Sequence, residues 1–340
     1  MTASVRVDPL LSQHLREVGT DAFEAESQGF THGWISETVA DPYSAAATGL
    51  LATEHLRIGT AVAIAFARSP FSLAQSAWEL SRASQGRFVL GLGTQVRAHA
   101  ERRLSVPWSP PVERLREYVL ALRAIWRAFQ DGGRLHFEGD YYTHTVFNEH
   151  FNPGPIDCPD IPVVLSGVNV RMAELAGEVA NGLLSHPLHT RAYLESVIWP
   201  AIRRGAERSG RDLEGFSVVV PVWVVTGDDD DERVVACDAI RRQIGLFGST
   251  TAYRRVFEAS GWPDLPQRLN AAMKEGGPDA AVDLVSDEVV RAVAVVADPQ
   301  DLRATLDERL GDVADAAMVY APLPCALLED GLARHLGLTG

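Results

Sequence analysis

Short apolar runs and amphipathic stretches alternate along almost the whole chain. The run at 88–92 is apolar without interruption, which is typical of a strand covered on both faces, and it breaks into small and polar residues at 93–95. Apolar residues at 114–129 recur at helical spacing, which predicts an amphipathic helix. The same reading along the chain predicts strands at 5–7, 30–37, 56–64, 86–95, 161–167, 182–186, 216–226 and 316–320.

These strands are separated by helical patterns with short connections. Such alternation predicts a parallel sheet with right-handed crossovers, and eight strands suit a closed (β/α)₈ TIM barrel better than an open sheet. We therefore expect an α/β fold with a single domain over 1–340. Ligands of such folds bind at the carboxyl ends of the strands, so residues 93–95 are expected near a site.

Two segments do not fit the simple repeat. Residues 131–160 follow strand four and its helix and are rich in Gly, Pro, His and aromatic residues; a loop of this length predicts a lid. Residues 228–297 are mostly helical by pattern and separate the last two strands. We interpret them as a helical insertion between strands seven and eight.

Composition narrows the range of functions. The chain has 340 residues, is 46% hydrophobic and carries a formal net charge of −14, which argues against binding nucleic acid or an anionic membrane surface. The three cysteines, Cys158, Cys237 and Cys325, are isolated, and this favours a reducing cytoplasm. The sequence shows no signal peptide and no apolar run of membrane-spanning length.

Common catalytic motifs are absent from the sequence. Gly91-x-Gly93 lacks the third glycine of a dinucleotide fingerprint, because that position is Val96. Neither a phosphate-binding P-loop nor a G-x-S-x-G hydrolase motif occurs. His186 and His189 are separated by a proline that disfavours a helical ligand pair, so we predict no metal site.

Several motifs, in order and at the right spacing, resemble the bacterial-luciferase-like flavin and deazaflavin oxidoreductases, and the match covers nearly the whole chain. They are Gly29-Phe30-x-x-x-Trp34-Ile35-Ser36-Glu37, Arg57-Ile58-Gly59-Thr60-Ala61-Val62-Ala63, Arg68-Ser69-Pro70, Gly86-Arg87-Phe88-x-Leu90-Gly91-Leu92-Gly93-Thr94 and 173–182. A subgroup regarded as dependent on coenzyme F420, much of it actinobacterial, is similar at Gly93-Thr94-Gln95-Val96, Tyr142-Thr143-His144-Thr145, Asn152-Pro153-Gly154-Pro155 and Arg241-Arg242-Gln243-Ile244.

The resemblance implies a TIM barrel with the cofactor ring in the mouth at its carboxyl end. It implies a non-proline cis peptide aligned with Ala61-Val62, and a ring resting beside Gly93 and Thr94. It further implies that the cofactor phosphate lies on backbone amides after strands five and six. The residues aligned with those loops are Ser166, Gly167, Val168, Asn169, Ser185 and His186.

The chain departs from its relatives at two positions that bear on catalysis. Many relatives carry Asp-His where this chain has Glu37-Thr38, and dehydrogenases of the family carry a catalytic Glu near the position of Gln95. Candidate proton donors are Glu37, His99 and His144, each of which could equally be a structural residue. Arg68 could bind an anion or form an ion pair at a helix start.

The resulting hypothesis is a coenzyme F420-dependent oxidoreductase that moves a hydride between deazaflavin C5 and a small organic substrate. The main alternative is a monooxygenase of the same family that uses reduced FMN. A further alternative is a protein that binds the cofactor without catalysis. Since relatives commonly pair through barrel helices, we also expect a homodimer, with a small molecule as its other partner.

Overall fold

The protein is described by a computed structural model that covers residues 4–226 and 230–320. Its centre is a parallel sheet with the strand order β1-β12-β10-β9-β8-β5-β3-β2. The bounds are β1 (Arg6–Pro9), β2 (His32–Ile35), β3 (Arg57–Thr60), β5 (Phe88–Gly93), β8 (Val163–Ser166), β9 (Gly182–Leu184), β10 (Ser217–Val225) and β12 (Ala316–Tyr320).

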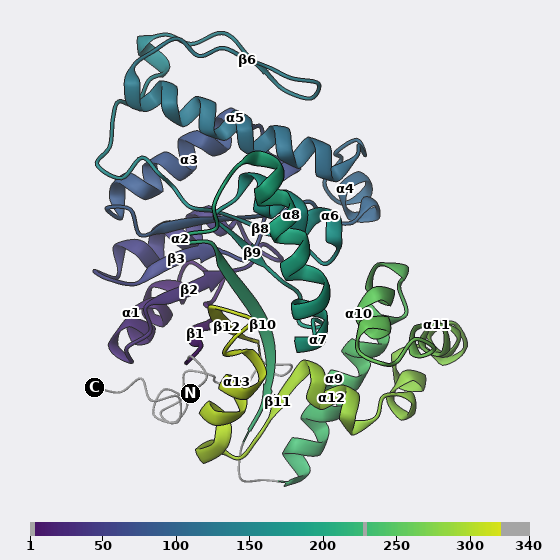
Figure 1. Ribbon diagram of the computed structural model, residues 1–340. Helices are drawn as coiled ribbons and strands as arrows, with labels where there is room; N and C mark the ends of the chain where they lie inside the picture. The colour runs from purple at the N-terminus through teal and green to yellow at the C-terminus, as the bar shows by residue number, and fades with distance from the viewer. Residues whose placement is uncertain (1–3, 227–229, 321–340) are drawn as a thin grey trace.

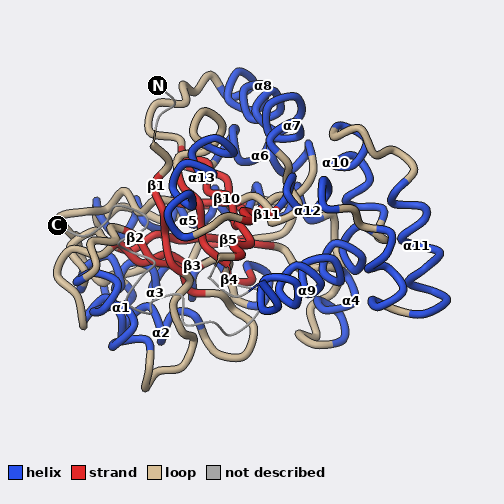
Figure 2. Tube along the Cα trace, turned by 90° about the horizontal axis from the view of Figure 1, so that it is seen from below, coloured by secondary structure: helices blue, strands red, loops and turns tan. Residues whose placement is uncertain are grey.

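The two ends of this sheet meet. Leu10, directly after β1, forms a parallel bridge with Trp34 of β2, and the Leu11 N–H donates to the Trp34 carbonyl at 2.8 Å. Figure 2 shows the strands gathered at the centre with helices around them. The predicted (β/α)₈ barrel is therefore confirmed, with each predicted strand present within a few residues of its expected bounds.

The helices that cover the barrel begin and end where local chemistry favours it. Asp41 and Ser69 cap the first turns of α2 and α3 with their side-chain oxygens, and each helix has Pro at its first position. Gly132, in the left-handed region, ends α5. The bounds are α1 (Val18–Ser27), α2 (Pro42–Leu51), α3 (Pro70–Ala83), α5 (Pro111–Asp131), α6 (Val170–Val179), α8 (Trp199–Ser209) and α13 (Leu302–Leu310); the short α7 (Arg191–Tyr193) and a π-helix (Leu194–Ile198) lead into α8.

The strands pack on both faces, which explains their uninterrupted apolar runs. Their outer faces join the helices in one large core, while a smaller cluster fills the barrel interior. The interior also holds a buried carboxylate, Asp8, which accepts from Trp34 Nε1 at 2.9 Å and pairs with Arg6 at 2.7 Å. The interior cluster consists of Trp34, Val89, Val164, Leu184, Val219, Ala316 and Met318.

Strand three is interrupted at the position that the resemblance implied. The Ala61–Val62 peptide is cis, and the chain then resumes as β4 (Ala63–Ile64) beside the end of β5. The expected non-proline cis peptide is thus confirmed.

The segment 131–160 packs on the outside of the barrel. Its hairpin, β6 (Phe137–Glu138) with β7 (Thr143–His144), lies on the side of α5 away from the sheet (Figure 1). The Glu117 carboxylate of α5 accepts from the backbone N–H groups of residues 140–142 at 2.6 to 2.8 Å. Farther on, Trp78 Nε1 of α3 donates to the Gly154 carbonyl at 3.0 Å. These contacts hold the segment against the outer helices, and a role as a lid stays a prediction.

The insertion is helical as expected, except at its end. It contains α9 (Asp230–Gly248), α10 (Arg254–Ala259), α11 (Leu265–Gly276) and α12 (Asp287–Val293). The sequence reading missed the strand that follows, β11 (Ala294–Val296), which pairs in parallel with β10. In Figures 1 and 2 these helices project from one side of the barrel. Residues 228 and 229, the first two of the predicted insertion, lie outside the described residues.

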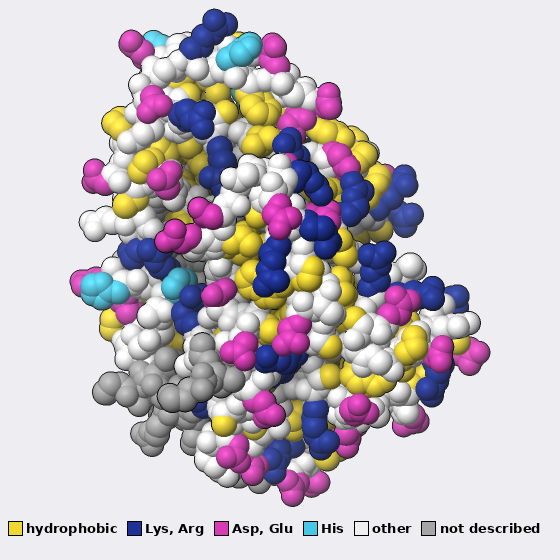
Figure 3. Space-filling view, viewed as in Figure 1, with side chains coloured by type: hydrophobic (Ala, Val, Ile, Leu, Met, Phe, Trp, Pro, Cys, Tyr) yellow, Lys and Arg dark blue, Asp and Glu magenta, His cyan; other side chains and the backbone are white. Residues whose placement is uncertain are grey.

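The surface mixes charges of both signs. On the face seen in Figure 3, basic and acidic side chains are interspersed. Ion pairs such as Arg116–Glu178 and Arg204–Glu174 join neighbouring helices. Within residues 4–226 and 230–320, no helix has the length and apolar character needed to cross a bilayer.

Candidate active site

The ends of β4, β5 and β8 meet closely at the mouth of the barrel. A Cβ atom added to Gly93 would lie 2.5 Å from Val62 Cγ2 and 3.8 Å from Ser166 Cβ, so only glycine fits at this position. One step lower, Thr60 Oγ1 accepts from the Gly91 N–H at 2.9 Å and donates to the Gly91 carbonyl at 2.6 Å. The structure therefore brings together the predicted residues Ala61, Val62, Gly93 and Ser166 as one tight wall.

Beyond this wall, Thr94 and Gln95 lead into α4 (Arg97–Arg102). Both are partly buried, and Gln95 has a φ of 61°, a left-handed conformation that is uncommon for a residue with a side chain. His99 of α4 is exposed. Gln95 and His99 thus follow the carboxyl end of β5, and their part in catalysis stays a prediction.

Glu37 lies at the mouth but is fully engaged. Arg68 Nη1 donates to both oxygens of the Glu37 carboxylate, at 3.0 and 3.1 Å. The Ile64 N–H also donates to this carboxylate, at 2.6 Å. Arg68 also donates to Asp41 at 2.8 Å and stacks on the Tyr43 ring at 4.8 Å. The structure thus assigns Glu37 to fixing β4, and Arg68 to an ion pair.

His144 packs against the start of α3 and against its own hairpin. Its ring lies against Phe71 of α3 and Phe137 of the hairpin, with centroid distances of 6.2 and 6.5 Å. Burial lowers its pKa, and Nε2 has no hydrogen-bond partner. These aromatic surroundings are typical of a packing residue, and a catalytic role of His144 stays a prediction.

The loop after β8, residues 166–169, leads directly into α6. Its Gly167 N–H donates to the Leu184 carbonyl at 3.2 Å, so this loop lies beside the end of β9. Asn169, the residue before α6, makes no side-chain cap. The first amides of a helix lack intrahelical partners and favour an anion, so this end of α6 is suited to a phosphate.

The loop after β9 carries polar groups that lack partners. Ser185 is 3% exposed and its Oγ makes no hydrogen bond. His189 is fully buried beside the Val168 backbone, and both of its ring nitrogens are unpaired. Trp223 Nε1 and Thr226 Oγ1, at the end of β10, are also buried without a partner. Buried polar atoms are normally hydrogen-bonded, so the unpaired Ser185 hydroxyl suits a polar ligand.

His186 contacts the insertion, a contact that the sequence reading missed. Its Nε2 lies 3.0 Å from the Tyr253 hydroxyl, and its ring packs edge-on against Phe247 with centroids 4.8 Å apart. Burial lowers the pKa of His186 to about 3, so the imidazole is neutral near pH 7. Nothing in the local sequence around Tyr253 indicates this contact, because the two residues are 67 positions apart.

The motif at 241–244, which resembles the F420-dependent subgroup, stabilises the insertion. Arg241 donates to Asp238 at 2.6 Å and also pairs with Asp287. Arg242 pairs with Asp279 at 2.6 Å, and Ile244 is buried. These contacts join α9 to the segments that follow it, and they place none of the four residues at the strand ends.

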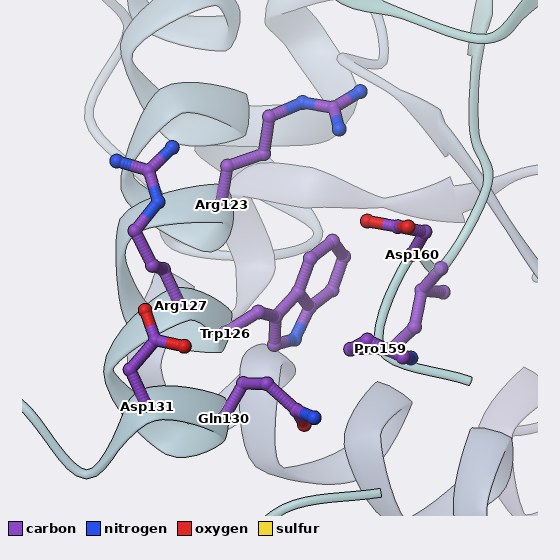
Figure 4. A pocket seen from close by; sticks show the side chains of 8 residues that line it. Arg123, Trp126, Arg127, Gln130, Asp131, Pro159 and Asp160 are labelled. Atoms are coloured by element: carbon purple, nitrogen blue, oxygen red, sulfur yellow. The ribbon is translucent and has the colours of Figure 1, made fainter. Parts of the chain in front are cut away.

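A separate hollow of about 210 Å³ lies outside the barrel, between α5 and the chain that enters β8. Figure 4 shows Arg123 and Arg127 on the helix side, Asp160 opposite and Trp126 between them. Arg123 Nη2 is already bound to the Val179 carbonyl and Asn181 Oδ1 at 3.0 and 3.1 Å. Because this hollow is at the amino end of β8, it is distinct from the candidate site.

Comparison with known proteins defines the family. The profile of the luciferase-like monooxygenases matches residues 1–315, and the chain belongs to this family. It is 43% identical to an uncharacterized protein of Mycobacterium tuberculosis over 317 residues, which cover 92% of each chain.

Two further relatives are more distant. A 5,10-methylenetetrahydromethanopterin reductase of Methanolobus tindarius is 26% identical over 84% of each chain. Among solved structures, the coenzyme F420-dependent tetrahydromethanopterin reductase of Methanopyrus kandleri superposes with a TM-score of 0.76 at 21% identity, over 99% of this chain and 97% of the other. The recognised family and the barrel fold are thereby confirmed.

The mouth suits a flat, phosphate-bearing cofactor. Backbone and small side chains around Gly93 make one part of the mouth, and the adjoining end of β9 carries the unpaired Ser185 hydroxyl next to the start of α6. A flavin or deazaflavin combines an aromatic ring with a phosphate, so its two parts suit these two neighbouring parts of the mouth. Within the described parts of the chain, no three His, Cys, Asp or Glu residues converge as metal ligands.

Proposed function

We propose that the protein is an oxidoreductase that uses coenzyme F420 to transfer a hydride to or from a small organic substrate. The observation that carries this proposal is the bare wall at Val62, Gly93 and Ser166, together with the buried, unpaired Ser185 hydroxyl at the adjoining end of β9. Membership of the luciferase-like family and the relatives that use F420 support the choice of cofactor.

When bound, the deazaflavin would supply the hydride chemistry at its C5 atom. The residues of this chain would orient it: Ala61, Val62, Gly93 and Thr94 beside the ring. The loops at Ser166-Gly167-Val168-Asn169 and Ser185-His186 would bind the phosphate. These assignments keep the residues expected from the sequence, and the closeness of their strand ends favours them.

Protein groups must also handle one proton. Glu37 is held in its ion pair and His144 packs among aromatic rings, so we favour the exposed His99 among the three predicted donors. Its exposed position on α4 allows exchange with solvent. Gln95, in its unusual backbone conformation beside the wall, is placed to contact substrate.

A reduced-FMN monooxygenase is the second candidate, because the family is described by that activity. Titration of the purified protein with oxidised and reduced F420, and separately with FMN, tests the choice through changes in cofactor fluorescence. We expect saturable binding of F420. Tight FMN binding with no F420 binding would support the monooxygenase instead, and binding of F420 without turnover of any substrate panel would support a cofactor-binding protein.

We also propose a homodimer. Leu15, Phe23, Val39 and Leu51, on α1, α2 and their flanks, are all more than half exposed. Exposed apolar side chains of this kind favour association of two copies. Size-exclusion chromatography with light scattering should give a mass of two chains, and a mass of one chain would contradict the proposal.

A further inference from the structure

A hollow of about 420 Å³ lies within the insertion, between α9, α12 and the end of β11. Helix α12 contacts both α9 and β11, and Figure 1 shows the three elements close together. All the residues that line the hollow belong to the stretch 230–296. Its volume lies in the range of small-molecule sites, roughly 300–1,000 Å³. The insertion therefore builds a candidate ligand site without any contribution from the barrel strands.

Apolar side chains make one part of the lining. Val234 comes from α9, Val290 from α12 and Val296 from β11, so all three elements contribute. Val290 is buried, whereas Val234 is 59% exposed and leaves one side of the hollow open. The half-buried Cys237, one helical turn after Val234, lines the same hollow. Such a lining favours the hydrocarbon part of a ligand.

Charged side chains make the rest of the lining, and they differ in how they are engaged. Arg233 is paired with Asp230 at 2.7 Å, and Arg241 is paired with Asp287. These pairs compensate both carboxylates of the lining. The third guanidinium, Arg291 of α12, is exposed and makes no hydrogen bond or ion pair with any residue that the structure describes.

The uncompensated guanidinium determines the kind of head group. Two more carboxylates, Asp238 and Asp298, bind Arg241 and Arg233, so those two arginines are fully engaged. Arg291 is left to bind a ligand. A guanidinium offers a planar fork of N–H donors that matches the two oxygens of a carboxylate. A carboxylate attached to a short apolar chain therefore matches both parts of the lining.

We propose that this hollow binds a small carboxylate with a short, unbranched hydrocarbon chain. The carboxylate pairs with Arg291, and the chain packs against Val234, Val290 and Val296. The inference does not depend on the cofactor of the barrel, because it rests on residues of the insertion alone.

Alkylation of Cys237 reports whether the hollow is occupied, because this thiol is part of its lining. The wild type would be treated with iodoacetamide at about pH 8.5, since burial raises the pKa of the Cys237 thiol. Peptide mass spectrometry gives separate rates for Cys237 and for the exposed Cys158, which serves as the internal control. Saturating hexanoate should slow the alkylation of Cys237 by about 5-fold or more and leave that of Cys158 unchanged.

Matched ligands test the chemical class. Each methylene added between butyrate and hexanoate should tighten binding by about 4-fold. 1-Hexanol should bind about 10-fold more weakly than hexanoate, and hexylammonium more weakly still, because neither can pair with a guanidinium as an anion does. Equal protection of Cys237 by all three head groups would overturn the carboxylate assignment. No protection by hexanoate up to the millimolar range would overturn the site.

Two pairs of variants test the residues. Arg291→Gln should weaken hexanoate binding by about 10-fold, whereas Arg268→Gln, which removes an exposed guanidinium of α11, should not change it. Val234→Glu adds a carboxylate to the lining and should weaken hexanoate binding by about 10-fold or more. Its neighbour Val235 is 56% exposed and outside the lining, so Val235→Glu should bind as the wild type does.

All four substituted side chains are exposed, so the variants are expected to fold. Unchanged hexanoate binding in Arg291→Gln would overturn the role of this arginine. Equal losses in Val234→Glu and Val235→Glu would overturn the location of the site, because only Val234 lines the hollow.

Discussion

Two sides of the barrel mouth differ in how their polar groups are satisfied. On the side of β2 and β4, Glu37, Arg68 and Asp41 pair with one another and with backbone. On the side of β9 and β10, Ser185, His189 and Trp223 have buried polar atoms without partners. A satisfied network fixes geometry without a ligand, whereas unpaired atoms make the folded chain less stable until a ligand pairs them.

Removing one partner from the satisfied side should have the largest effect. We expect Glu37→Gln to lower the free energy of unfolding by about 2–3 kcal/mol, because it leaves Arg68 and the Ile64 N–H poorly paired in a site where the Glu37 side chain is 14% exposed. Urea denaturation measures this. The control Glu79→Gln disrupts an exposed pair with Arg82 and should cost under about 0.5 kcal/mol. Similar losses of unfolding free energy in both variants would show that the contacts of Glu37 do not stabilise the fold.

On the side of the mouth with unpaired polar atoms, His189 should make the folded protein less stable at acidic pH. Burial lowers the pKa of His189 from 6.5 to about 3, so between these values the unfolded chain binds a proton that the folded chain excludes. Stability is therefore complete above pH 6.5 and falls as the pH decreases, by up to about 1.4 kcal/mol per unit from this residue. Urea denaturation at pH 7 and pH 5 should show a smaller difference for His189→Gln than for the wild type or for the exposed control His150→Gln. An unchanged difference would contradict the prediction.

Ser185→Ala should separate stability from binding. We expect the ligand-free protein to be unchanged or up to about 1 kcal/mol more stable, since an unpaired buried hydroxyl is removed, while F420 affinity falls about 5-fold. Ser81→Ala is the matched control: its buried hydroxyl donates to the Cys158 carbonyl at 3.0 Å, so its loss should cost about 1 kcal/mol and leave affinity unchanged. A Ser185→Ala variant that is destabilised yet binds normally would contradict our reading of the two sides.

The smallest expected change concerns Gln95. Its φ of 61° is strained for a side-chain-bearing residue, so Gln95→Gly should add about 0.5 kcal/mol of stability. Gln85→Gly, at a φ of 55° after α3, should add a similar amount. If Gln95 contacts substrate, Gln95→Gly and Gln95→Leu lower turnover without loss of cofactor binding, whereas Gln85→Gly does not. Unchanged turnover in the Gln95 variants would show that Gln95 is not part of the site.

The barrel could be predicted from the sequence because its signals are local. Uninterrupted apolar runs marked the strands, and Ser69-Pro70 marked the start of α3. The strand-end residues Val62, Gly93 and Ser166 could be placed together because the topology of a parallel barrel brings strand ends to one edge.

The errors concern contacts between residues distant in sequence. The hairpin at 137–144 could not be placed, because Glu117 holds its backbone from more than 20 residues away. The role of Glu37 depended on Arg68, 31 positions later, and that of His186 on Tyr253. A titratable residue read in isolation shows what chemistry is available, but its packed neighbours decide whether that chemistry is used.

The short pairing of β11 with β10 has a consequence for how this protein could change. Trp223–Val225 and Ala294–Val296 lie side by side, so the chain leaves the barrel and returns to it at adjacent points. The segment between these points is an insertion with adjacent ends, so its replacement need not alter the path of any barrel strand. The region is therefore a natural place for evolution, or for an engineer, to graft a different specificity onto the same catalytic frame.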